Sequence, residues 1–293
     1  MSDIRTSPST RKLALERGID IEALARNLGR STIGPEDLSG GKSKAAAPAG
    51  DTSYWEVDHA QYGPVTEEPL SRFARVAARN LAAAQALIPA VTHHDRADVS
   101  AIEALRKAWK ADAQVRGVKL TALAFHVVAL SRCLREFPRF NASLSADGER
   151  LILKDFVHVG IAVDTPHGLM VPVIRNADRK GLWRIAAEIA DLAARAQARK
   201  VGPEEMGGAS MTITNLGGIG GTAFTPIVNP PEVAILGITR TETVTVWEDE
   251  TPRPVPMAPL DLSYDHRVIN GADAARFLAR YAALIGEPRN MLI

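Results

Sequence analysis

A chain of 293 residues, with 46% hydrophobic and 24% charged residues, has the composition of a folded globular protein of one or two domains. Its formal net charge of +1 gives no reason to expect nucleic acid or an acidic membrane surface as the main partner. The single cysteine, Cys133, excludes an intramolecular disulfide and a cysteine-bound metal cluster. Its apolar helical surroundings indicate a buried small side chain rather than a nucleophile.

The first residues, Met1–Arg5, contain no apolar signal core, and no apolar run is long enough to span a bilayer. We therefore expect the protein in the cytoplasm, and we expect no metal site.

Residues 5–38 are expected to form a compact helical unit. Ser7 can cap a helix that has proline at its first position, and Gly18 can end that helix. Asp20 can cap a second short helix, and residues 34–38 have the composition of a third helix start. A core built from about 35 residues is too small to be comfortable alone, so such a unit usually exists to bind a partner.

A flexible linker is expected over residues 39–66. Its first part, residues 39–50, contains glycine, proline and small residues with little to bury. A surface loop inside one domain is the alternative, but the composition changes on both sides of the segment. A larger domain is then expected over residues 67–293.

In this larger domain, helical and strand patterns alternate, which predicts an α/β (α+β two-layer) fold with a mixed sheet covered by helices. Ser100 and Glu103 suggest a capping box, and one helix must end before Pro138. Helices are predicted over residues 71–87, from 100, from 121, over 182–199 and over 272–284. Strands are predicted over residues 91–95, 156–163, 169–174, 210–214, 232–239 and 259–264.

The segment Asp265–Gly271 places His266 between charged neighbours, just before a predicted helix. A histidine at such a position can accept a proton near neutral pH, as attack by a thiol or hydroxyl requires. Gly271 can take a positive φ, which would let the chain turn sharply at this point. The histidine by itself is weak evidence, because most histidines are surface or satisfied core residues.

A second segment, Met211–Gly221, has the pattern of a strand that runs into a glycine-rich loop. A hydroxyl at the end of the strand can point into a cleft, and glycines let a ligand approach the backbone. The P-loop pattern is absent and no helix is predicted to follow, so we reject a phosphate-binding loop. A structural turn is the simplest interpretation of this segment in isolation.

Taken together, these segments resemble the 2-oxo acid dehydrogenase complex acyltransferases, and within them the proteobacterial acetyltransferases of pyruvate dehydrogenase. The segment around His266 resembles their DHRxxDG signature, with Asn270 where most members carry Asp and some acetyl-type members carry Asn. The resemblance covers residues 67–293 and implies a chloramphenicol-acetyltransferase-like catalytic domain. His93 and His94 are assigned no chemistry. The other segments that carry the resemblance are Pro138–Asn141, Gly160–Pro166, Gly168–Val173, Thr212–Gly217, Pro226–Gly237 and Leu262–Arg267.

The N-terminal unit resembles the peripheral subunit-binding domain of the same proteins at Ser7–Ala14 and Glu36–Leu38. The family's glycine-rich loop between them does not match. Arg11 keeps one basic contact for an acidic partner. The resemblance implies 2-oxo acid dehydrogenase and dihydrolipoamide dehydrogenase components as partners.

Family members usually begin with lipoyl domains, and none is recognised upstream of residue 5. We therefore expect no lipoylation site in this chain and a lipoyl group supplied in trans.

The resemblance implies acyl transfer between a dihydrolipoyl thioester and coenzyme A, which is a substrate. His266 would be the base, Thr214 would donate a hydrogen bond to the tetrahedral intermediate, and Asn270 would orient the site. Asp265 and Arg267 are expected to form a structural ion pair. No residue is assigned to coenzyme A binding.

In this family the active site lies between subunits of a trimer, and trimers join into a larger core. The resemblance therefore implies a homotrimer, with the apolar end Met291–Ile293 suited to docking. Two alternatives stay open. One is a non-catalytic core or scaffold component, and the other is a chloramphenicol-acetyltransferase-like enzyme acting on a small alcohol.

Overall fold

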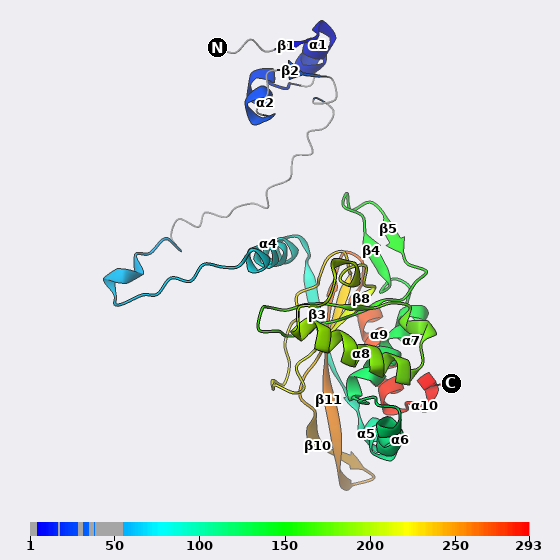
Figure 1. Cartoon of the computed structure of the whole chain (residues 1–293). Helices are drawn as coiled ribbons and strands as arrows, with labels where there is room; N and C mark the ends of the chain where they lie inside the picture. The colour runs from blue at the N-terminus through cyan, green and yellow to red at the C-terminus, as the bar shows by residue number, and fades with distance from the viewer. Residues whose placement is uncertain (1–4, 17, 29–31, 35–37, 39–54, 293) are drawn as a thin grey trace. The chain divides into compact units, whose positions relative to one another are not determined.

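The computed structural model describes residues 5–16, 18–28, 32–34, 38 and 55–292. Contacts between residues divide the chain into two compact units, Met1–Thr66 and Glu67–Ile293 (Figure 1). Most of the predicted linker, residues 39–54, lies outside the described residues. Within the described residues, no helix combines the length and hydrophobicity needed to cross a membrane.

The first unit contains two short helices, whose ends follow the predicted signals. The Ser7 hydroxyl accepts a hydrogen bond from the Thr10 N–H at 3.1 Å, and Gly18, two residues after the end of the first helix, takes a φ of 64°. Asp20 Oδ1 accepts the N–H groups of Glu22 and Ala23. Its elements are β1 (Arg5–Thr6), α1 (Pro8–Glu16), α2 (Ile21–Leu28) and β2 (Thr32–Ile33), with β1 parallel to β2. Most of the predicted third helix start lies outside the described residues.

The second unit confirms the predicted α/β class (Figure 1). Ser71 caps the helix expected at 71–87, and the helix expected from residue 121 ends before Pro138. The predicted capping box is wrong, because Ser100 lies inside its helix and its N–H donates to Asp98 Oδ1 at 2.8 Å. The helices are α4 (Arg72–Leu87), α5 (Ser100–Ala108), α6 (Lys110–Val115), α7 (Ala122–Glu136), α8 (Leu182–Gln197), α9 (Gly271–Gly286) and α10 (Arg289–Leu292).

A seven-stranded mixed sheet has the order β10-β11-β9-β8-β6-β7, and β3 also pairs with β11. Strands β6, β8 and β9 are parallel neighbours, whereas β11 is antiparallel to β9, β10 and β3. The strands of this sheet are β3 (Ala90–Asp98), β6 (Val159–Ile161), β7 (Val173–Ile174), β8 (Met211–Asn215), β9 (Ala234–Ile238), β10 (Glu242–Glu248) and β11 (Thr251–Asp265). A separate hairpin pairs β4 (Ala142–Leu144) with β5 (Leu151–Leu153).

Strand β11 is longer than expected, and β10 was not predicted. The first part of β11 contains Pro252, Pro254 and Pro256, and proline normally argues against a strand because it has no N–H to donate. In this part β11 pairs with β10 alone among the described strands, as an edge hairpin. A proline nitrogen on such an edge can face away from the partner, so the ladder tolerates it.

The two faces of the sheet differ in chemistry. Leu236 and Ile238 on β9 and Leu260 and Leu262 on β11 enter the main core together with residues of α7, α8 and α9. Since side chains alternate along a strand, the intervening residues lie on the opposite face, which we call the second face. It carries buried polar residues, among them Thr212, Asp261 and Ser263.

The end of the described chain packs on its own domain. Met291 is 1% exposed and belongs to the main core, and α10 lies against α7 and α9. The expectation that Met291 serves docking to another subunit is therefore wrong, because this side chain is already buried in its own core. Ile293 lies outside the described residues.

Candidate active site

His266 follows directly after β11 and is exposed. Its backbone N–H donates to the carbonyl of Pro89 at 3.1 Å, which ties it to the start of β3. The predicted ion pair between its neighbours is confirmed, since Arg267 donates from Nη2 to Asp265 Oδ2 at 2.7 Å and from Nε to Oδ1 at 2.9 Å. The buried Asp265 also accepts the Arg267 N–H at 3.0 Å. The residue before the histidine is thus bonded to the residue after it, through both the backbone and the side chain of Arg267.

The turn around the histidine is built differently from the prediction. Gly271 does not take a positive φ; it is the first residue of α9, and Asp265 O closes the turn by accepting the N–H groups of Val268 and Ile269. Asn270 is the N-cap of α9, where its Oδ1 accepts the N–H of Asp273 at 2.9 Å. Asparagine is one of the best residues for this position.

Thr214 lies near the end of β8 and is partly buried. On this strand Met211 and Ile213 enter the main core, so Thr212 and Thr214 lie on the second face. Thr214 is directly opposite Gly237 on β9, and Gly237 is directly opposite Asp261 on β11. The predicted glycine-rich loop follows, with no helix over residues 216–223.

The sheet register separates the two predicted catalytic residues within one chain. The row through Thr214 crosses β11 at Asp261, five residues before His266. At about 3.4 Å per residue along the strand and about 4.8 Å between strands, their backbones are roughly 20 Å apart. Side chains cannot bridge such a gap, so a single protomer does not bring His266 and Thr214 together.

A buried carboxyl group is bonded to Thr212, which lies two residues before Thr214 on the same face of β8. Glu232 is 5% exposed, and its Oε1 accepts hydrogen bonds from Thr212 Oγ1 at 2.9 Å and from Asn229 Nδ2 at 3.2 Å. Its Oε2 is buried and has no hydrogen-bond partner among the residues that the structure describes. Burial raises the pKa of Glu232 to about 7, and the two hydrogen bonds and the nearby Lys154 only partly oppose this rise.

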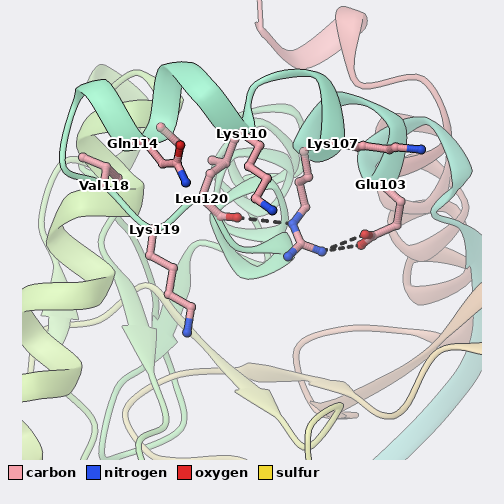
Figure 2. A pocket seen from close by; sticks show the side chains of 9 residues that line it. Glu103, Lys107, Lys110, Gln114, Val118, Lys119 and Leu120 are labelled. Carbon is pink, nitrogen blue, oxygen red and sulfur yellow. Dashed lines mark hydrogen bonds and ion pairs between the residues drawn. The ribbon is translucent and has the colours of Figure 1, made fainter.

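A basic groove of about 390 Å³ lies along α5, α6 and the loop that follows (Figure 2). Four cationic side chains line it against a single carboxylate, that of Glu103, which binds Arg106 at 2.6 and 2.8 Å. In Figure 2 the side chain of Lys107 extends away from those of Lys110 and Lys119. The four cations are Arg106, Lys107, Lys110 and Lys119.

The sequence interpretation did not identify this groove. The close spacing of Arg106, Lys107 and Lys110 was an available signal, but charges on a helix usually belong to a solvated face. Lys119 comes from the following loop, and only the fold brings it to the same groove.

The interpretation of Cys133 as a buried small side chain is confirmed, since it is fully buried and burial raises its pKa to about 12.

The buried carboxyl group predicts a pH-dependent stability. Below pH 4.5 both the folded and the unfolded state hold the Glu232 proton; between pH 4.5 and about 7 only the folded state keeps it. Stability should therefore fall as pH rises through this window, and Glu232→Gln should remove that loss, which is on the order of 3 kcal/mol. Urea unfolding of both proteins at several pH values measures it.

The exposed Glu149 provides a control, since Glu149→Gln makes the same replacement of a carboxyl by an amide at a solvated position. Parallel pH profiles for Glu232→Gln and the wild type would show that Glu232 is ionised in the folded protein, contrary to this expectation.

Comparison with known proteins places these features in a family. A family model described as 2-oxoacid dehydrogenases acyltransferase (catalytic domain) matches residues 62–293. The chain is 45% identical to the dihydrolipoyllysine-residue acetyltransferase component of the pyruvate dehydrogenase complex of Azotobacter vinelandii, over 99% of this chain and 47% of that protein. It is 44% identical to the corresponding protein of Pseudomonas aeruginosa, over 99% of this chain and 55% of that protein. The chain thus spans about half the length of these relatives.

Several solved structures are also similar to this chain. A solved structure of Azotobacter vinelandii dihydrolipoamide acetyltransferase matches this chain with a TM-score of 0.80 and 50% identity, over 81% of this chain and 98% of that chain. It comes from a crystallographic and enzymatic study of the role of a serine, a histidine and an asparagine in the catalytic mechanism. The cubic core of a pyruvate dehydrogenase multienzyme complex matches with the same values. A truncated catalytic core from Thermoplasma acidophilum has a TM-score of 0.70 and 35% identity, over 76% of this chain and 99% of that chain. The chain therefore belongs to the family of 2-oxoacid dehydrogenase acyltransferases and contains its catalytic domain.

Proposed function

We propose that this protein transfers an acetyl group between a dihydrolipoyl thioester and coenzyme A in a pyruvate dehydrogenase complex. One observation carries the proposal. The serine, histidine and asparagine studied in the Azotobacter vinelandii enzyme have the same spacing in sequence as Thr214, His266 and Asn270. The chain thus has a hydroxyl, an imidazole and an amide at the three corresponding positions, within a domain 50% identical to that enzyme.

His266 acts as the general base in this proposal. A thiol with a pKa of about 8.5 is mostly protonated at neutral pH, so a base that removes its proton speeds its attack on a thioester carbonyl. The imidazole is exposed, while its backbone is fixed by Pro89 and by the Asp265–Arg267 pair. A thiol can therefore approach a side chain whose attachment point is held in place.

Thr214 donates a hydrogen bond to the negative oxygen of the tetrahedral intermediate. Its hydroxyl can play the same part as the serine of the relative, since both side chains carry a hydroxyl on Cβ. The register of the sheet keeps Thr214 away from His266 of its own chain. We therefore place the site between two protomers, with the hydroxyl from one and the imidazole from its neighbour, in a trimer that joins a larger core.

Asn270 is proposed to act through the helix that it caps. Its Oδ1 is bonded to the Asp273 N–H, which leaves the amide nitrogen as the part that can donate toward the site. The cap fixes the first turn of α9, four residues after His266. Asn270 therefore orients the segment that carries the imidazole.

The basic groove is our candidate for the phosphates of coenzyme A. Lys110 and Lys119 are exposed, and four cations face one carboxylate among the side chains that line it. Phosphate groups bind such clusters through charge-assisted hydrogen bonds.

The N-terminal unit is proposed to bind a dehydrogenase component of the complex. Arg11 is exposed on α1 and can contact an acidic partner. The acetyl group arrives on a lipoyl group of the complex. We place the reaction in the cytoplasm, because coenzyme A and the dihydrolipoyl group each carry a free thiol that needs a reducing compartment.

Substitution of the two catalytic groups tests the proposal. His266→Ala should lower kcat for acetyl transfer from acetyl-dihydrolipoamide to coenzyme A by about 10²- to 10⁴-fold, because the base is lost. Thr214→Val keeps the shape but removes the hydroxyl, and should cost about 10²-fold. Thr214→Ser should retain most of the rate.

The exposed His59 of the first unit supplies a control, since His59→Ala should leave the rate unchanged. A wild-type protein as slow as His266→Ala would reject the enzyme and favour a scaffold component.

Charge reversal tests the groove. Lys110→Glu and Lys119→Glu should each raise the KM for coenzyme A about fivefold to tenfold, because a cation near the phosphates is replaced by an anion. Pantetheine has the same thiol arm without the nucleotide phosphates, so its use as acceptor should not change. Steady-state kinetics with both acceptors measures this, with Lys200→Glu as the surface control. Equal effects on both acceptors would place the phosphates elsewhere.

A further inference from the structure

Four neighbouring strands place four residues in one row on the second face. His94 on β3 is directly opposite Asp261 on β11, which is opposite Gly237 on β9, which is opposite Thr214 on β8. Residues directly opposite each other in a sheet point to the same face. The row therefore links the proposed oxyanion donor to a histidine and a carboxylate that the proposed reaction does not use.

Asp261 is the buried centre of this row. It is 1% exposed, its Oδ1 lies 2.6 Å from His94 Nδ1, and its Oδ2 accepts the backbone N–H of Phe224 at 3.3 Å. An ionised carboxylate can only accept, so His94 donates from Nδ1. A buried charge needs such partners, and here they come from β3 and from the loop after β8. Asp261 thus ties that loop to the sheet.

Phe224 fills the place in the row that Gly237 leaves empty. A Cβ added to Gly237 would lie 2.6 Å from Phe224 Cε1 and 3.1 Å from Asp261 Cβ, so the ring lies directly over this glycine. Gly237 is the immediate neighbour of Thr214 in the row. The same loop is held a second time, because Thr239 Oγ1 donates to Thr222 O at 3.2 Å.

We propose that Asp261, with His94, is a positioning group for the half of the active site that contains Thr214. It fixes Phe224 over Gly237 as an apolar wall beside the Thr214 hydroxyl. Such a wall keeps water from the oxygen on which negative charge develops, where a hydrogen-bond donor stabilises the transition state more in a drier environment. The catalytic part of this inference rests on the proposed acetyl transfer, while the tie between Asp261 and the loop does not.

A double-mutant cycle tests the catalytic part. Asp261→Ala should lower kcat for acetyl transfer about tenfold in the wild-type background. In a Phe224→Ala background the same substitution should lower it less than about twofold, because the wall is already absent. Asp261→Asn keeps an oxygen for the Phe224 N–H and should recover most of the rate. Equal losses in both backgrounds would overturn the proposal.

A matched control lies two residues away along the same two strands, β3 and β11. Thr92 Oγ1 and Ser263 Oγ are 2.7 Å apart, so Thr92→Val also breaks a cross-strand hydrogen bond, while the bond from the Phe224 N–H to Asp261 is left in place. It should leave the rate within about twofold of the wild type. A loss as large as that of Asp261→Ala would reduce the effect to a general weakening of the sheet, and would overturn the proposal.

Hydrogen exchange read by mass spectrometry tests the tie without any activity. Peptides that cover residues 217–228 should exchange faster in Asp261→Ala than in the wild type, and should be unchanged in Thr92→Val. Unchanged exchange in Asp261→Ala would overturn the proposal. A wild type that lacks acetyl transfer would instead reject the proposed function, and the exchange data would still decide whether Asp261 holds the loop.

Discussion

The pairing register of β8, β9 and β11 is the constraint on which the account of this protein depends. Thr214 is opposite Gly237, and Gly237 is opposite Asp261. His266 comes five residues after Asp261, beyond the end of β11, and is therefore far from Thr214 of the same chain. A register fixed by a buried face cannot slip by one residue without exposing the core. A hydroxyl and an imidazole separated by such a rigid element can meet only if different protomers contribute them, so the proposed catalysis requires an assembly.

The second face of the sheet is the surface on which this chemistry is proposed to occur. One face is an ordinary hydrophobic core, while the other carries polar pairs, namely Thr92–Ser263, His94–Asp261 and Thr212–Glu232, in each of which at least one partner is buried. Burial of polar groups costs free energy unless each finds a partner, so these pairs also define where the covering loop can lie. The same interactions that stabilise the fold thus shape the surroundings of Thr214.

Features that depend on short stretches of sequence could be predicted. The caps at Ser7 and Asp20 and the helix after His266 follow from local patterns, and the structure contains them, although Gly271 does not take a positive φ. Features that depend on pairing between distant strands could not. Asp261 lies 167 residues from His94, and neither residue alone signals the pair. Ser100 was expected to cap its helix, but its own N–H is instead accepted by Asp98 Oδ1, and only the path of β3 brings Asp98 to that position.

The most direct measurement mixes two inactive proteins. Chains with His266→Ala and chains with Thr214→Val, each carrying a different affinity tag, would be co-expressed and purified through both tags, and acetyl transfer to coenzyme A would be assayed. If each site takes its imidazole and its hydroxyl from different protomers, random mixing restores roughly a quarter of the wild-type sites, although neither variant alone is active. Mixed assemblies that are as inactive as the separate variants would contradict a shared site.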